Sequence, residues 1–531
     1  MIALLLALLV SSPQQPARDA ARPGGTRTAA ISGRVLGTDG KTPLRRAIVR
    51  LTSSALPRRL TVRADLQGRY AFPDLPAGRY TVSASKPGYL ALEYGQRRPF
   101  EPGRRIELDA AERLARVDIL LPASASITGV VSDETGERVN QMWVMAVRQA
   151  YRNGRRSPVV TAFTVTNDIG EFRLSGLAPG EFYIATTERD ARMNEFSDEP
   201  FGYGTTLYPG VSTLPAAQPV RVTVGQPLTG VAIPVAASRT AAIAGAVVDE
   251  SGRAITAQRI TVTDGPNIAG LGGVVGGAVT DAMGAFRIAS VRPGVYLLLA
   301  NNQQKSGDVQ VEVREADVSG VTIVVGGGGT LNGRVTTPAG PPGPKAGLIQ
   351  LCALATGTSR CASGSPRVGP DGSFTWPGVR GARLVRANGM PEGWWLKAVL
   401  QGDRDITDVP LSITHGEVVG DLQVVFDDKP TMLSGSVTDS SGAPVSDYTV
   451  VVFSSDEARW SPESRFIASE RPDQTGRVRI TGLPSGDYLM AAVEWVEEGE
   501  WLDPRFLQRL RPLASKVGLE AGQTLAVPLK R

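Results

Sequence analysis

Hydrophobic and polar residues alternate in short runs along most of this 531-residue chain, and glycine turns separate the runs. In "DIGEFRLSGLAPGEFYI", residues 168–184, Phe172 and Leu174 alternate with polar residues, and a second alternating run follows Gly180. A period of two with one apolar face is typical of a strand that buries one side. The stretch therefore predicts a β-hairpin.

The same hairpin recurs along the chain, as "DLQGRYAFPDLPAGRYTV", "DAMGAFRIASVRPGVYLL" and "DQTGRVRITGLPSGDYLM". The turn glycines of the five copies are Gly68, Gly170, Gly284, Gly372 and Gly476. A second glycine follows ten residues later in four copies and nine residues later in the fourth. This interval is nearly fixed because one inserted residue would turn every later side chain of the strand to the opposite face.

Each copy also has an opening strand built around a glycine. These opening glycines are Gly33, Gly129, Gly245, Gly333 and Gly435, and they lie 88 to 116 residues apart. The repeating unit is therefore domain-sized, unlike the shorter repeats of solenoids. The pattern predicts five modules, at residues 31–124, 125–238, 239–328, 329–429 and 430–531. Module 4 is divergent, because Arg383 occupies a position that is aromatic in the other modules.

The opening "SGxV", the D-x-x-G-x-[YF] turn and the "L-P-x-G-x-Y" arm together resemble the carboxypeptidase regulatory-like domain. The resemblance implies an all-β chain of five tandem antiparallel β-sandwiches of the immunoglobulin-like or prealbumin-like kind, which are also grouped with starch-binding-domain-like folds. Such domains are accessory modules of secreted enzymes, of surface proteins and of the N-terminal parts of outer-membrane receptors. In the last module, "DPRFLQRL" adds a short helix capped by Asp503, which we expect to cover an edge of the sandwich.

Composition agrees with a globular all-β protein, since the chain is 42% hydrophobic and contains 60 glycines and 38 prolines. The net charge is only +5, and basic and acidic residues are intermixed. A nucleic-acid partner would require a concentrated basic surface, so we expect none. We interpret "RNGRR" at 152–156 and the arginines near residue 104 as solvated loop charge.

The N-terminal run "IALLLALLV" has the length of a signal-peptide core and is too short to span a bilayer. It predicts a signal peptide at residues 1–12, a disordered lead-in at 13–30 and a mature chain without a transmembrane span. The protein would then be secreted, periplasmic or exposed at the cell surface. Cys352 and Cys361 are the only cysteines. They could form a disulfide across a hairpin or remain two thiols, and the sequence leaves both open.

Catalytic motifs are missing from the sequence. A single histidine, His415, rules out an H-E-x-x-H zinc site, and no G-x-S-x-G elbow occurs. The hairpin-turn aspartates, Asp168 among them, are explained as turn-capping residues. The acidic clusters "SDEP" at 197–200, "DDK" at 427–429 and "VEEGE" at 496–500 are interpreted as solvated loops. We therefore expect no enzyme activity, no cofactor and no metal.

Aromatic residues outside the core-facing strand positions are the candidate ligand-binding residues: Trp394, Trp395, Trp501, Tyr203 and Tyr208. Packing within loops is the alternative for each of them. The predicted function is a non-catalytic binding or scaffold protein with polysaccharide or an envelope protein as partner, and the carbohydrate part rests on fold analogy. Two alternatives remain: a periplasmic component of an outer-membrane uptake or assembly system, and a hydrolase using an unrecognised carboxylate pair.

Overall fold

The structure is a computed structural model that describes residues 28–188, 201–264, 274–301, 306–356, 361, 364–390, 393–438, 441, 444–445 and 447–530. The predicted signal peptide, nearly all of the predicted lead-in and the acidic cluster at 197–200 lie outside these residues. The predicted fold class is confirmed: the described chain is built from β-strands in many separate sheets, which form five tandem sandwiches. The module boundaries predicted from the repeat stay predictions.

Modules 1, 2 and 3 share one plan, in which a sheet carrying the opening strand packs against a sheet carrying the arm strand. The strands of module 1 are β4 (Arg69–Leu75), β1 (Ala29–Gly37), β8 (Arg113–Leu114) and β9 (Ile119–Leu121), facing β3 (Leu60–Arg63), β2 (Ile48–Thr52), β5 (Gly78–Ser85), β6 (Leu92–Glu93) and β7 (Ile106–Leu108). Module 2 has β13 (Glu171–Leu177), β10 (Ala125–Ser132) and β18 (Pro227–Pro234), facing β12 (Arg155–Val165), β11 (Met142–Arg152), β14 (Gly180–Glu188), β16 (Thr206–Leu207) and β17 (Val220–Val222), with a small extra pair of β15 (Phe201–Tyr203) and β19 (Ala237–Arg239). Module 3 has β23 (Ala285–Val291), β20 (Ala241–Asp249) and β26 (Val318–Val325), facing β22 (Val274–Val279), β21 (Arg259–Asp264), β24 (Gly294–Asn301) and β25 (Ser306–Val313).

Modules 4 and 5 vary this plan. Module 4 has β29 (Ser373–Val379), β27 (Gly329–Thr336), β34 (Val418–Asp427), β31 (Trp395–Gln401) and β32 (Arg404–Asp405) in one sheet, and β28 (Gln350–Ala355), β30 (Gly381–Gly389) and β33 (Leu411–Ile413) in the other. Its divergence therefore includes a strand, β31, that pairs with the closing strand instead of the arm. Module 5 has β36 (Pro444–Val445), β35 (Met432–Thr438), β39 (Arg477–Thr481) and β42 (Thr524–Lys530), facing β38 (Ile467–Glu470), β37 (Thr449–Ser454), β40 (Gly486–Val493) and β41 (Ser515–Leu519).

One pairing departs from the antiparallel rule in every module. The opening strand pairs in parallel with the closing strand of the same module: β1 with β8 and β9, β10 with β18, β20 with β26, β27 with β34, and β35 with β42. Because the first and last strands run in the same direction, the chain enters each module at one end and leaves it at the other. This is the geometry that a tandem array needs.

The opening glycines are explained by this parallel pair. The closing strand comes so close that a Cβ on Gly129 would lie 1.9 Å from the Val231 carbonyl oxygen, and one on Gly245 would lie 1.9 Å from that of Val321. In these two modules the residue just before the intruding carbonyl is itself a glycine in the left-handed region, Gly230 (φ 82°) or Gly320 (φ 75°). The repeated glycines thus mark places where two backbones leave no room for a side chain.

The tyrosine of the "L-P-x-G-x-Y" arm stabilises the turn that precedes it through a hydrogen bond. The hydroxyls of Tyr80, Tyr296 and Tyr488 each donate a hydrogen bond to the carbonyl four residues earlier, at 2.7, 3.0 and 2.7 Å. All three rings are buried in their module cores. Module 2 has Phe182 at this position and packs the ring without that bond.

In modules 1, 2, 3 and 5 the hairpin turn is capped by a side chain three residues before the turn glycine, whereas module 4 has Gly369 there and Oδ1 of Asp371 accepts from the Ser373 amide instead. Oδ1 of Asp65 accepts hydrogen bonds from the amides of Gln67 and Arg69, and Asp281 and Asp473 do the same in modules 3 and 5. In module 2 the cap is Asn167, whose Oδ1 accepts from Ile169 and Glu171, so the assignment of Asp168 was wrong. The repeat register, counted back from the glycine, identifies the correct residue.

The predicted helix of module 5 is α1 (Pro504–Leu510), and Oδ1 of Asp503 caps it by accepting a hydrogen bond from the Arg505 amide at 2.9 Å. It lies over a sheet face instead of an edge, because Phe506, Leu507 and Leu510 pack onto the outer side of β37 and β40. Strand β37 is consequently buried on both faces, as its unbroken apolar sequence requires. Within the described residues, no helix is long and apolar enough to cross a membrane.

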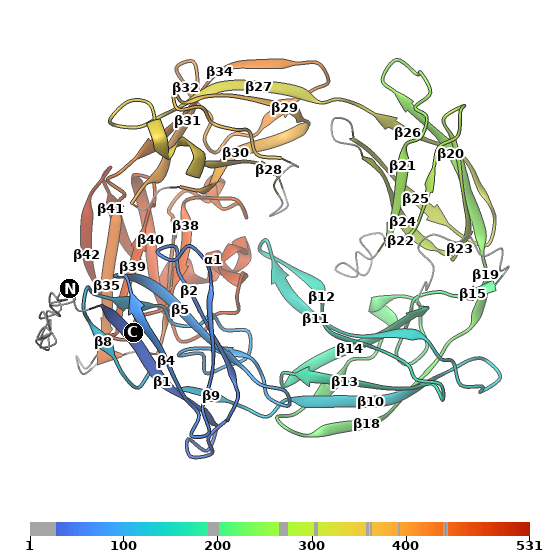
Figure 1. The fold of residues 1–531 in the computed structure, drawn as a ribbon, viewed down its shortest axis with the longest axis horizontal. Helices are drawn as coiled ribbons and strands as arrows, with labels where there is room; N and C mark the ends of the chain where they lie inside the picture. The colour runs from blue at the N-terminus through green and yellow to red at the C-terminus, as the bar shows by residue number, and fades with distance from the viewer. Residues whose placement is uncertain are drawn as a thin grey trace, which may run out of the picture.

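The five modules follow one another around a ring, so that module 5 returns to the side of modules 1 and 2 (Figure 1). Within the described residues, Arg292 pairs with Glu188 between modules 2 and 3, and His415 Nδ1 lies 2.6 Å from Glu250 between modules 3 and 4. Module 5, in contrast, is tied to modules 1, 2 and 4 by several charged contacts. The repeat pattern contained no sign of this closure.

The opening-glycine contact predicts a position-specific cost within module 4. A Cβ on Gly333 would lie 2.3 Å from the Leu422 carbonyl oxygen, whereas nothing lies within 4 Å of one on Gly420 in the neighbouring strand. We expect Gly333→Ala to lower the free energy of opening of β27 and β29 by about 1–3 kcal/mol, the usual cost of overpacking. Hydrogen–deuterium exchange of the full chain measures this, with Gly420→Ala as control. Equal exchange rates in the two variants would contradict the steric explanation.

Alkaline pH should destabilise module 5 through Tyr448. Its buried hydroxyl donates to the Gly476 carbonyl at 3.0 Å, and burial raises the pKa of Tyr448 to about 12. An unfolded tyrosine ionises near pH 10, so this contribution to stability is complete below about pH 10 and is lost as pH rises towards about 12. Between pH 9 and pH 11, the free energy of unfolding measured in urea should fall less for Tyr448→Phe than for the unchanged chain. An identical pH dependence would refute this assignment.

Candidate functional site

Modules 1, 2 and 5 meet at a loop of module 1, Arg97–Arg104 ("RRPFEPGR"), which we call the closure segment. Arg97 pairs with Asp447 at 3.0 Å and Arg98 with Glu494 at 2.8 Å, both in module 5. The Phe100 carbonyl accepts a hydrogen bond from the Glu498 amide at 3.1 Å. These partners lie hundreds of residues apart in sequence, so the closure segment is where the ring closes.

A buried charge cluster forms the centre of this contact. Arg471 of module 5 is only 2% exposed, and its Nη2 lies 2.9 Å from both Glu101 Oε1 and Asp447 Oδ1. Its Nη1 donates to the carbonyls of Gly95 and Pro102 at 3.0 and 2.9 Å. Burial lowers the pKa of Arg471, while the charges of Glu101 and Asp447 oppose that shift. The guanidinium is therefore held by carboxylates and carbonyls from both modules.

The long β11–β12 hairpin of module 2 completes the junction. Arg148 stacks on the Phe100 ring, with 3.5 Å between the guanidinium carbon and the ring centroid, and pairs with Glu497 of module 5 at 2.6 Å. At the hairpin tip, a Cβ on Gly154 would lie 2.2 Å from the Leu502 carbonyl oxygen. Phe100 itself has a φ of 65°, which is uncommon for a bulky residue, and its contacts on both sides hold it there.

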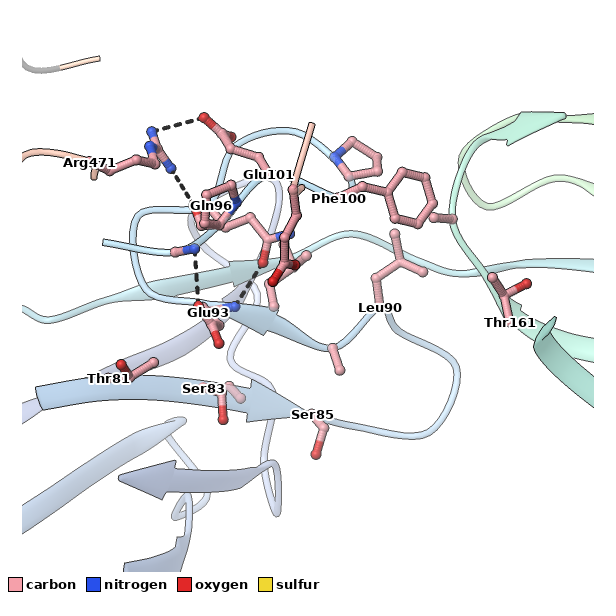
Figure 2. A pocket seen from close by; sticks show the side chains of 18 of the residues that line it. Thr81, Ser83, Ser85, Leu90, Glu93, Gln96, Phe100, Glu101, Thr161 and Arg471 are labelled. Carbon is pink, nitrogen blue, oxygen red and sulfur yellow. Dashed lines mark hydrogen bonds and ion pairs between the residues drawn. The ribbon is translucent and has the colours of Figure 1, made fainter. Parts of the chain in front are cut away.

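A cleft of about 720 Å³ lies at this junction, with walls from all three modules (Figure 2). We call it the junction cleft. Its module 1 side is formed by Thr81, Ser83 and Ser85, which alternate along β5 with core-facing residues. Thr161 of module 2 and Ser469 of module 5 add further hydroxyls, and Trp501 and Phe100 add aromatic surface. The cleft therefore combines small hydroxyl side chains with aromatic rings.

Several charged groups that line the junction cleft already have partners within the protein. Glu470 lies 3.4 Å from Arg79 and 3.8 Å from Arg105, and Arg50 donates to the Ser85 hydroxyl at 3.1 Å. Burial raises the pKa of Glu470, and the two arginines oppose that rise. Glu93 accepts a hydrogen bond from the Gly103 amide at 3.0 Å. The lining thus offers donors and acceptors without a dominant charge.

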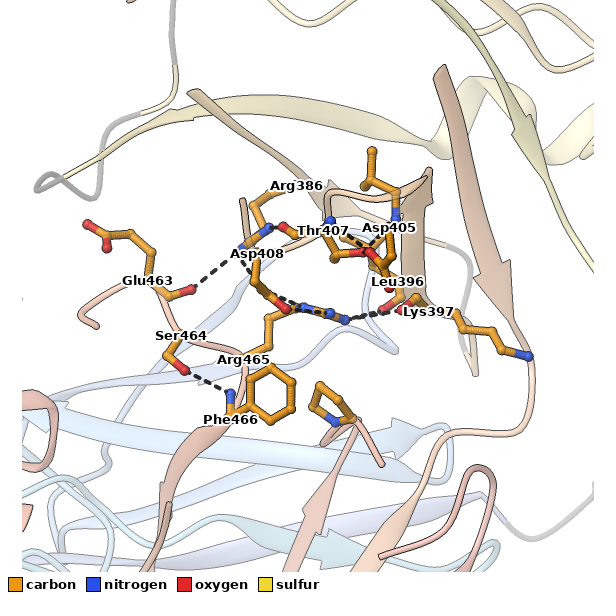
Figure 3. Close-up of polar contacts among 12 residues, drawn as sticks. Arg386, Leu396, Lys397, Asp405, Thr407, Asp408, Glu463, Ser464, Arg465 and Phe466 are labelled. Carbon is orange, nitrogen blue, oxygen red and sulfur yellow. Dashed lines mark hydrogen bonds and ion pairs between the residues drawn. The ribbon is translucent and has the colours of Figure 1, made fainter. Parts of the chain in front are cut away.

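A second cleft of about 740 Å³ lies between modules 4 and 5. Asp408 of module 4 joins the two walls, since it pairs with Arg386 at 3.0 Å and with Arg465 of module 5 at 2.8 Å (Figure 3). Arg465 also donates to the carbonyls of Leu396 and Lys397. Because these charged groups hold modules 4 and 5 together, we assign this cleft a structural role.

The aromatic residues singled out in the sequence lie in different places. Trp501 lines the junction cleft and Trp395 lines the module 4–5 cleft. Trp394 is half-buried against the module 4 core, with its ring 6.2 Å from that of Phe426. Tyr203 and Tyr208 pack on the module 2 core. The five residues therefore do not form one shared platform.

The two cysteines are joined in the structure. Cys352 and Cys361 form a disulfide with 5.3 Å between their Cα atoms. The bond ties strand β28 to the segment that follows it, on the module 4 sheet opposite β31. It lies in neither cleft.

The arginines of "RNGRR" are exposed, as expected, although the backbone at Gly154 of this hairpin tip docks on module 5. Two other charged stretches, expected to be solvated loops, are corrected by the structure: arginines near residue 104 lie in or beside the closure segment, and Glu497 of "VEEGE" is buried against Arg148. Their complementary signs were visible in the sequence. Which acidic stretch meets which basic one depends on the ring, and no local pattern encodes that.

Comparison with known proteins identifies the first module. Residues 30–121 match the carboxypeptidase regulatory-like domain family. This confirms the resemblance seen in the sequence, and the other modules repeat the opening and closing strands of this regulatory-like domain. No curated protein matches the chain.

Solved structures with similar sandwich modules share little sequence with this chain. They include the Bacillus anthracis TIE protein (10% identity, 74% of this chain and 68% of that chain, TM-score 0.16) and a streptococcal ancillary pilin (13%, 56% and 98%, TM-score 0.21). Two B repeat units of the Staphylococcus aureus collagen-binding protein are a third (13%, 75% and 99%, TM-score 0.15). Similarity at this level bears on neither the ring nor the function.

The buried cluster predicts that Arg471 holds the ring closed. Arg471→Ala would leave the buried Glu101 carboxylate without the Arg471 guanidinium, a change that typically costs about 3–5 kcal/mol for a buried pair, whereas Asp447 would keep Arg97 at 3.0 Å. We expect faster hydrogen exchange in residues 97–104 of the full chain. Arg314→Ala removes an exposed pair, 81% and 59% accessible, and should cost at most about 1 kcal/mol. If the closure segment of Arg471→Ala kept its protection against hydrogen exchange, the cluster would not be what holds the ring closed.

Proposed function

We propose that this chain is a non-catalytic scaffold protein of the cell envelope or the extracellular space, which binds polysaccharide and keeps its five modules in a closed ring. The observation that carries the proposal is the buried Arg471–Glu101–Asp447 cluster between modules 1 and 5. A surface ion pair adds little rigidity, whereas a desolvated charge is tolerated only while its partners stay in place. The cluster therefore favours one fixed arrangement of the modules.

A fixed arrangement of the modules favours ligand binding. Ligand-binding surfaces that are already held in position lose less entropy when a ligand arrives. Two of the four glutamates that line the junction cleft are engaged in holding the modules: Glu101 with Arg471, and Glu470 with Arg79 and Arg105. His415 is likewise paired with Glu250 at the boundary of modules 3 and 4, at 2.6 Å.

A disulfide bond supports an envelope or extracellular location. The Cys352–Cys361 disulfide is the kind of bond that persists in oxidising compartments. The apolar N-terminal run interpreted as a signal peptide would deliver the chain to such a compartment.

The proposal is tested in two measurements on the full chain. Small-angle X-ray scattering should give a compact, ring-like profile that does not require ligand. Incubation with insoluble polysaccharides, namely cellulose, chitin and a β-1,3-glucan, should retain the protein on at least one of them without releasing reducing ends. An extended, flexible scattering profile would overturn the ring, and release of reducing ends would overturn the non-catalytic role.

A further inference from the structure

We infer that the junction cleft binds a neutral glycan segment and that it does so only in the closed ring. The inference rests on the proposed function. It adds the location of the binding site, the neutral charge of the ligand and the requirement that the ring be closed. The cleft measures about 720 Å³, within the range of about 300–1,000 Å³ typical of ligand sites.

The hydroxyl groups of the lining match a polyhydroxylated ligand. Serine and threonine hydroxyls donate and accept hydrogen bonds, as sugar hydroxyls do, so either partner can adapt to the other. Thr81 and Ser83 present such groups from β5, and Thr161 presents another from module 2. Ser469 Oγ is buried and has no hydrogen-bond partner within the described part of the chain. A hydroxyl in that state is a group that a ligand could satisfy.

The electrostatics of the cleft select against a charged ligand. Glu470 is paired with Arg79 and Arg105, Glu101 is paired with Arg471, and Arg50 is bonded to Ser85. An anionic glycan or a strongly charged peptide would have to compete with these internal partners for its own counter-charge. A neutral sugar can bond to the outer edges of the same groups without separating them.

Aromatic surface completes the match. Trp501 of module 5 and Phe100 of module 1 line the cleft; Trp501 packs on the apolar cluster of its own module, and Phe100 is held by Arg148 across the closure. Aromatic rings with an apolar body suit the apolar faces of sugar rings. Trp501 is the one sequence-predicted aromatic candidate that the structure places in this cleft.

Glycan binding depends on the closed ring because the walls of the cleft come from three modules. Ser83 belongs to module 1, Thr161 to module 2, and Ser469 and Trp501 to module 5. If the closure segment released module 5, the module 5 wall would move away from the other two. Binding is therefore coupled to closure, and a bound glycan would in turn stabilise the closed ring.

The test uses isothermal titration calorimetry of the full chain with cellohexaose, chitohexaose and laminarihexaose. Polygalacturonate and a mixture of unstructured peptides serve as the charged and protein-like probes. Ser83→Trp should fill the cleft, and Trp501→Ala should remove its aromatic wall. Each should weaken binding of the neutral glycan at least tenfold.

Matched controls separate this effect from a general loss of structure. Thr61→Trp puts the same bulk on the same face of the sheet, since Thr61 pairs with Arg50, which pairs with Ser83, but Thr61 does not line the cleft. Trp394→Ala removes a tryptophan that lies outside both clefts. Both controls should bind as the unchanged chain does.

The dependence on closure has its own variant. Asp447→Ala with Arg148→Ala removes the Arg97–Asp447 and Arg148–Glu497 contacts across the closure without altering a residue that lines the cleft. It should enlarge the particle in scattering and weaken glycan binding at least tenfold.

Full binding by Ser83→Trp and Trp501→Ala would overturn the site while leaving the scaffold function intact. Preference for polygalacturonate or the peptides would overturn the ligand class, and full binding by the opened double variant would overturn the coupling. A wild-type chain that is extended in scattering would instead refute the ring itself.

Discussion

The burial of one positive charge organises this molecule above the level of the single module. Arg471 is removed from water where modules 1 and 5 meet, and it remains there because Glu101, Asp447 and two backbone carbonyls compensate for the lost hydration. Such compensation is possible in one relative position of the modules. Arg148 between Phe100 and Glu497 adds a second requirement from module 2, so three sandwiches are fixed by contacts that none of them could make alone.

Within each module a different constraint operates, and it is steric. The closing strand presses its backbone against the opening glycine, and in modules 1, 3 and 5 the arm tyrosine hydrogen-bonds to the turn behind it. These features recur because each depends on a few neighbouring residues that the repeat copies together. The junction residues do not recur: module 1 alone has the closure segment, and module 2 alone has the long hairpin that reaches module 5. The chain thus combines a repeated fold with a junction that occurs once.

This division explains how much the sequence could predict. The hairpins, the opening glycines, the helix capped by Asp503 and the sandwich class all follow from local spacing, and the repeat register even corrects the turn cap from Asp168 to Asn167. The candidate site could not be predicted in the same way. Glu497 and Arg148 are 349 residues apart; beside its own neighbours, Glu497 looks like an ordinary loop charge and Arg148 like an ordinary strand residue. Trp501 was selected for its type, but nothing local indicated that serines of module 1 would face it.

The parallel pairing of the first and last strands has a mechanical consequence. Tension applied to the two ends of a module would act along β20 and β26 in opposite directions, and it would load all the hydrogen bonds between them at once. A hairpin pulled open from one end breaks its bonds one after another and yields to less force. The ring contacts would be stretched before any module, so they could give way first and let the chain lengthen while every sandwich stays intact.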